Sequence, residues 1–169
     1  MKTTINKTFV VNEPIDKVWN TLTNPEQVVS AVPGASLTNT IDEDNFEGAV
    51  TLKFGPIKAS YTGKITFEER DVANHKMVMK GAGTDSKGKG GADMVMTGIL
   101  KEVEEGTEVN ANMDVTVTGM LAQFGSRLIN DVSDSVFDQF VGNFKKLLAG
   151  EEFSNSMSAG NMIKGMFGK

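Results

Sequence analysis

Methionine is the residue type whose spacing most invites a chemical interpretation. Five of the ten methionines fall on the apolar side of three predicted strands, and they are Met77, Met79, Met94, Met96 and Met113. Because methionine is flexible and polarizable, such a group suits a cavity that adapts to a bulky apolar guest. Two other interpretations stay open. These side chains can simply fill the core, or the two Met-x-Met pairs can act as soft thioether ligands for Cu(I).

Two further segments resemble functional motifs without meeting their requirements. Residues 83–91 are rich in glycine and lysine, but they lack the G-x-x-x-x-G-K-[ST] spacing and precede a strand, so a hairpin is predicted rather than a phosphate site. His75 is the only histidine, and no carboxylate or nucleophile accompanies it in the sequence as a general base would need. It is interpreted as a solvated turn residue. No catalytic residue, metal ligand or cofactor is therefore predicted.

Tyr61 and Trp19 are the sole residues of their types. Each combines an apolar ring with a polar group that can form a hydrogen bond, so each suits either a pocket wall or a core. Tyr61 falls on the apolar side of its predicted strand, where both interpretations stay open. Core packing is favoured for Trp19.

A period of two in hydrophobicity runs through the middle of the chain. Apolar or small residues alternate with lysine, threonine and glutamate over residues 46–54, 57–67, 77–83, 92–100 and 109–117. This pattern predicts antiparallel strands with one face in the core and one in water. Residues 5–11 add an earlier strand. Glycines on the inner side, such as Gly48, Gly63 and Gly81, can curve the sheet and leave volume beside it.

Helical signals flank these strands. Asn12-Glu13-Pro14 and Asn24-Pro25 are typical of helix starts and predict two short helices after the first strand. After Gly119, apolar residues recur at steps of three or four up to Leu147, which predicts one uninterrupted helix of about 28 residues, or roughly 42 Å. Its apolar stripe needs a large partner surface, and the strands provide the candidate.

The predicted fold class is therefore α+β: a helix-grip fold, in which a curved antiparallel sheet of about seven strands surrounds a long C-terminal helix. The expected domain spans residues 1–149, and residues 150–169 are expected to form a flexible tail. An internal apolar cavity is expected where the sheet and the helix fail to fill the space between them. Its predicted lining is Phe46, Phe54, Tyr61, Met77, Met79, Met94, Met96, Met113, Phe124, Leu128 and Val132.

Several short words, in order along residues 1–148, are similar to the CoxG family, the G-type subunits of carbon monoxide dehydrogenase, within the START-like (SRPBCC) superfamily. The words are Val32-Pro33-Gly34-Ala35, Gly55-Pro56 followed by Tyr61-Thr62-Gly63, the segment 83–90, and Leu121-Ala122-Gln123-Phe124-Gly125-Ser126-Arg127. The resemblance implies an accessory protein of molybdenum hydroxylase systems, associated with membrane recruitment or quinone handling. It carries over no catalytic motif.

Composition narrows the function classes. The chain has 169 residues, a formal charge of −5 and no cysteine, so one domain is expected and thiolate chemistry is excluded. The acidic balance disfavours nucleic-acid binding. The N-terminus lacks the apolar run of a signal peptide, so a cytoplasmic location is expected, with peripheral contact at the inner membrane face as an option. Residues 161–169 are interpreted either as a weak membrane- or partner-docking foot or as a frayed tail.

The leading functional hypothesis is non-catalytic. The chain is expected to bind a hydrophobic small molecule, quinone- or lipid-like, in the internal cavity and to bring a molybdenum hydroxylase of carbon monoxide dehydrogenase type to the membrane. One alternative is an enzyme on the same scaffold, a cyclase or hydrolase, which would need titratable groups pointing inward. The other is a purely structural docking subunit, which would have a solid core.

Overall fold

The computed structural model describes residues 1–54, 56–88 and 90–153, and the side chains of residues 54 and 57 lie outside the description. The elements follow the predicted order of strand, two short helices, six strands and a long helix. They are β1 (Lys2–Val11), α1 (Ile15–Leu22), α2 (Pro25–Ala31), β2 (Ala35–Thr40), β3 (Asn45–Phe54), β4 (Ile57–Asp71), β5 (Lys76–Asp85), β6 (Gly91–Val103), β7 (Gly106–Val117), the 3-10 helix η1 (Leu121–Phe124) and α3 (Gly125–Ala149).

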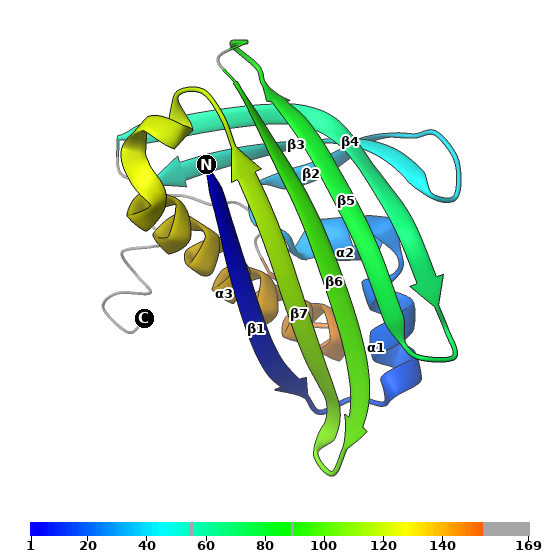
Figure 1. Cartoon of the computed structure of the whole chain (residues 1–169). Helices are drawn as coiled ribbons and strands as arrows, with labels where there is room; N and C mark the ends of the chain where they lie inside the picture. The colour runs from blue at the N-terminus through cyan, green and yellow to red at the C-terminus, as the bar shows by residue number, and fades with distance from the viewer. Residues whose placement is uncertain (55, 89, 154–169) are drawn as a thin grey trace.

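The seven strands form one antiparallel sheet in the order β1-β7-β6-β5-β4-β3-β2. Strands β2 to β7 pair with their neighbours in sequence, and β1 joins the far side by pairing with β7 (Figure 1). The register keeps the apolar parities aligned, so that Met79 faces Met96 and Met96 faces Met113 across neighbouring strands. The predicted fold class, an α+β helix-grip arrangement with about seven strands, is confirmed.

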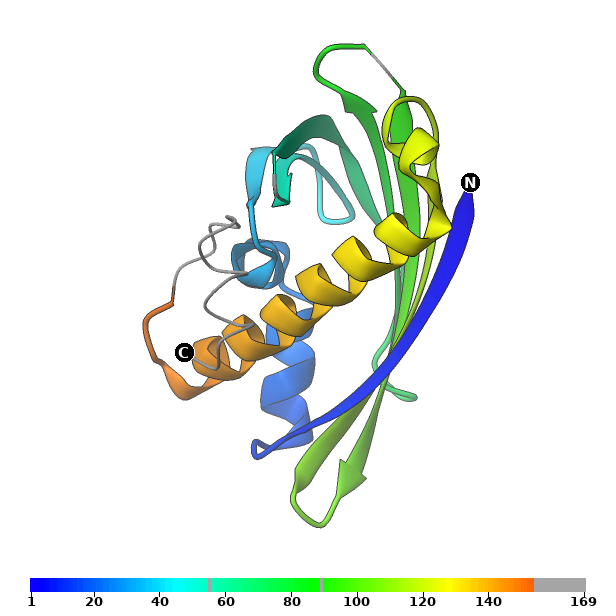
Figure 2. The same ribbon diagram turned by 90° about the vertical axis from the view of Figure 1, so that its left-hand side faces the viewer.

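The sheet curves strongly, and α3 crosses its concave side (Figure 2). Irregular register between Phe67 and Glu69 marks a bulge where β4 pairs with β5, and bulges bend the strand that contains them. Farther along the same pair the backbones come very close. A Cβ atom on Gly63 would lie 2.0 Å from the carbonyl oxygen of Ala82, so only glycine fits there. Glycine thus contributes to the shape of the sheet, as the sequence predicted.

The long helix is shorter than predicted. Residues 121–124 form a separate 3-10 turn, and α3 begins only at Gly125 and has 25 residues. Gly125 has φ 88° and ψ 165°, a conformation outside any right-handed helix and accessible almost only to glycine. The prediction of one uninterrupted helix from the residues after Gly119 is therefore wrong at its first turn.

Contacts at several points fix α3 over the sheet. Near its N-terminal half, Lys7 of β1 forms an ion pair with Asp134 (Nζ to Oδ1, 3.2 Å), and the Thr3 hydroxyl donates a hydrogen bond to Asn130. Further along, the Asn143 side chain donates a hydrogen bond to the backbone carbonyl of Ala31 at the end of α2 (3.1 Å). The helix is thereby tied both to an edge of the sheet and to the short helices.

The apolar core is divided into two clusters. The larger one gathers α1, α2, the C-terminal part of α3 and the adjoining strands, and includes Trp19, Met77 and Phe144. The smaller one joins Tyr61 of β4 and Val117 of β7 to the start of the helical segment. A single fully packed core would usually form one contiguous cluster of buried residues. The division indicates that the space between sheet and helix is incompletely filled.

Candidate ligand-binding cavity

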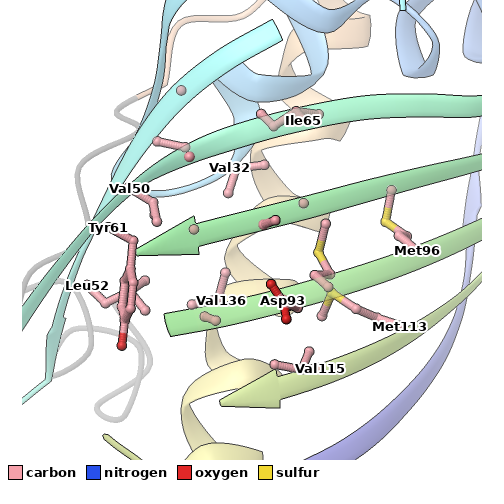
Figure 3. Close-up of a pocket in the computed structure, with 18 of the residues that line it drawn as sticks. Val32, Val50, Leu52, Tyr61, Ile65, Asp93, Met96, Met113, Val115 and Val136 are labelled. Carbon is pink, nitrogen blue, oxygen red and sulfur yellow. The ribbon is translucent and has the colours of Figure 1, made fainter. Parts of the chain in front are cut away.

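A cavity of about 340 Å³ lies between the concave face of the sheet and helices α2 and α3 (Figure 3). Its volume falls within the range of small-molecule pockets, which runs from about 300 to 1,000 Å³. Three parts of the fold line it. They are the inner side of the sheet with Val50, Leu52, Tyr61, Ile65, Met79, Met94, Met96, Met113, Val115 and Val117; helix α2 and its end with Val28, Val29 and Val32; and the helical segment with Leu121, Ile129, Val132, Ser133, Val136, Phe137 and Phe140.

Methionines form the middle of the sheet wall. Met79, Met96 and Met113 stand in one row across β5, β6 and β7 because the strand registers place them directly opposite one another. Met94 lies two residues from Met96 on β6 and faces Gly81 of β5. A Cβ on Gly81 would lie 3.6 Å from the terminal methyl of Met94, so the missing side chain leaves open space beside a flexible one. This wall is soft and uneven.

Charge is confined to the margin of the cavity. Lys64 and Asp93 border it, but both are exposed, and strand alternation places them on the water-facing side of the sheet. Tyr61 is the only other titratable residue among the described residues that line the cavity. The described lining therefore supplies van der Waals contacts and few polar groups, as suits an apolar guest.

Tyr61 is the polar exception inside. Its side chain extends from β4 beside Leu52 with the oxygen at the far end (Figure 3), and the residue is only 6% exposed. Burial, and after it the negative charge of Asp85, raises the pKa of the Tyr61 phenol above its ordinary value. A phenol whose neutral form is favoured in this way remains a hydrogen-bond donor throughout the neutral pH range.

Six predicted lining residues border the cavity: Tyr61, Met79, Met94, Met96, Met113 and Val132. Their role in binding a ligand stays a prediction. The side chain of Phe54, which was also predicted to line the cavity, lies outside the described part of the chain.

Four predicted lining residues do not border the cavity. Phe46 packs edge-on against Phe67 in the core, with ring centroids 6.1 Å apart. Met77 is fully buried among residues of α1 and β6, because α1 covers that end of the sheet. Phe124 is 44% exposed, because the break at Gly125 turns η1 away from the helical stripe. Leu128 packs against the smaller core cluster without reaching the cavity.

Sequence reasoning missed the contribution of α2. Val28, Val29 and Val32 line the cavity, although the Asn24-Pro25 start signal correctly predicted the helix. Their apolar spacing was the available signal, but nothing in the sequence indicates that this short helix folds over the sheet. His75 lies in a turn as predicted, yet it is half-buried with its ring edge-on to Trp19 at a centroid distance of 5.5 Å.

Comparison with known proteins identifies the family. The family model of CoxG, the G-type subunit of carbon monoxide dehydrogenase, matches residues 8–149. The chain belongs to the CoxG family. The resemblance found in the sequence is thereby confirmed. No curated protein sequence matches this CoxG-family chain.

Solved structures agree with the fold. A conserved protein from Geobacillus kaustophilus is similar with a TM-score of 0.78 at 19% identity, covering 88% of this chain and 96% of that one. Norcoclaurine synthase from Thalictrum flavum gives 0.62 at 14% identity, covering 91% and 90%. The Zhui aromatase/cyclase from Streptomyces sp. R1128 gives 0.58 at 11% identity, covering 89% and 96%. At these identities the likeness shows a shared fold and nothing more.

Within the part of the chain that the structure describes, no helix of this CoxG-family protein combines the length and the apolar character that a membrane crossing requires.

The raised pKa of Tyr61 can be measured directly, because it is the only tyrosine. Tyrosinate absorbance should show a midpoint above the ordinary value of about 10 in the folded protein and near 10 in urea. Above pH 10 the unfolded chain then loses its proton first, so the free energy of unfolding should fall as pH rises, a component that Tyr61→Phe removes. A folded midpoint at or below 10 would show that the phenol is solvated, contrary to the structure.

Proposed function

We propose that this CoxG-family protein binds a hydrophobic small molecule, quinone- or lipid-like, in the cavity between its sheet and α3, without catalysing a reaction on it. The observation that carries the proposal is a lining of methionine, valine and phenylalanine around about 340 Å³. Burying an apolar molecule there removes surface from water on both partners, which stabilises a complex by about 25 cal/mol per Å².

Two features support binding over the alternatives. A docking subunit with a solid core would have no such cavity. An enzyme would need positioned acid, base or nucleophilic groups, and the described lining offers one buried phenol with charges only at its margin. The fold is compatible with small guests, since the norcoclaurine synthase structure is described as a complex with dopamine and hydroxybenzaldehyde.

We further propose, from the family's description as a subunit of carbon monoxide dehydrogenase, that the chain recruits a molybdenum hydroxylase of that type to the inner membrane face. The predicted docking foot, residues 161–169, lies outside the described residues. Vesicle flotation should carry such an enzyme upward only when the full-length chain is added. Equal flotation with a chain lacking residues 151–169 would remove the foot from the proposal, and no flotation at all would contradict recruitment.

The binding proposal is tested with the apolar dye N-phenylnaphthylamine, whose fluorescence rises in apolar surroundings. The wild-type protein should bind it in a saturable way. Val136→Phe adds a ring to a residue that lines the cavity, so it should weaken binding by roughly tenfold or more, equivalent to about 1.4 kcal/mol.

Val72→Phe is the matched control, because Val72 is 63% exposed and does not line the cavity. It should bind the dye as the wild type does. Unfolding of each variant can be followed through Trp19, which is buried and unique. Absence of saturable binding, or equal loss in both variants, would contradict the proposal.

A further inference from the structure

The hydroxyl of Tyr61 has no hydrogen-bond partner among the described residues, although the tyrosine is more than nine-tenths buried. Buried tyrosine hydroxyls usually find a partner, because leaving one unpaired costs about 1–3 kcal/mol. The Tyr61 oxygen is also absent from the side-chain polar atoms that are fully enclosed and unpaired, a group that contains only Arg70 Nε among the described residues. The hydroxyl therefore borders open space.

The open space next to Tyr61 is the cavity. Tyr61 lines it and packs in the smaller core cluster with Val117 of β7 and Val132 of α3, so its ring is held from both sides. Packing of this kind fixes the direction of the hydroxyl before any ligand arrives. A donor that is already oriented loses little freedom on binding, which makes its hydrogen bond more effective.

Resting on the proposed function, we infer that Tyr61 is the polar anchor of the cavity: its hydroxyl donates a hydrogen bond to an oxygen acceptor, such as a carbonyl, on an otherwise apolar ligand. The ligand class is thus narrowed from any hydrophobic molecule to one that carries an acceptor oxygen at one end and an apolar body against the methionine row. The raised pKa of Tyr61 supports this, because the neutral phenol keeps its proton available for donation.

Other hydroxyls border the cavity and provide a control. Ser133 of α3 also lines it and is half-buried. A serine within a helix can bond to a carbonyl of its own preceding turn, so it depends less on a ligand for a partner. Tyr61 has no such local acceptor on its strand, where the backbone carbonyls are used in pairing with neighbouring strands.

A pair of probes of nearly equal shape tests the inference. Acetylnaphthalene carries a carbonyl where isopropenylnaphthalene, substituted at the same ring position, carries a methylene group. Each displaces N-phenylnaphthylamine from the protein, which gives its affinity. The wild type should prefer the ketone beyond the ratio expected from their solubilities in water. Tyr61→Phe should weaken ketone binding about three- to tenfold and leave the hydrocarbon unchanged, and Ser133→Ala should alter neither.

The outcomes separate this inference from the proposed function. If neither probe binds the wild type, the cavity does not accept apolar molecules and both fall. If both bind but Tyr61→Phe affects them equally, binding stands and the anchor is wrong. Infrared spectra of the ketone bound to the wild type give an answer even if Tyr61→Phe fails to fold. A carbonyl stretch lowered from its value in hydrocarbon solvent supports the anchor, and an unshifted stretch overturns it.

Discussion

The cavity depends on how α3 is held against a curved sheet. Toward its C-terminal end the helix packs tightly, with Phe140 and Phe144 stacked at a centroid distance of 5.5 Å and Leu148 buried beside α1 and α2. Toward its start it is tied to the edge strand β1. Exposed ion pairs contribute little free energy, so the aromatic packing supplies most of the restraint. Between these two attachments the helix spans the sheet without filling the space beneath it.

The two walls of that space differ in stiffness. The sheet wall is built around Met79, Met96 and Met113, whose unbranched side chains change shape easily. The opposite wall includes Val28, Val32 and other β-branched residues, which have few accessible rotamers. One rigid and one adaptable wall suit a site that positions a ligand against the helices while tolerating variation in its apolar body. The Tyr61 ring, packed by its neighbours, belongs with the rigid side.

Much of this architecture was readable from the sequence, because strand alternation has a strict period of two and each inner parity proved correct. Position along a strand was not. Met77 and Met79 share a parity on β5, yet Met79 lines the cavity and Met77 is sealed beneath α1. Which end a short helix covers is set by tertiary packing, and no local pattern encodes it. The break at Gly125 was equally hidden, since glycine can be tolerated inside a helix and only its φ of 88° reveals the interruption.

The unfilled space itself is the central claim, and xenon tests it most directly, because xenon enters dry apolar cavities and scatters X-rays strongly. Crystals of the protein under xenon pressure should show bound xenon between the methionine row of β5 to β7 and Val136 of α3. Val136→Phe crystals should lose or displace that density. Interlocked side chains throughout the region, with no xenon in wild-type crystals, would contradict the account.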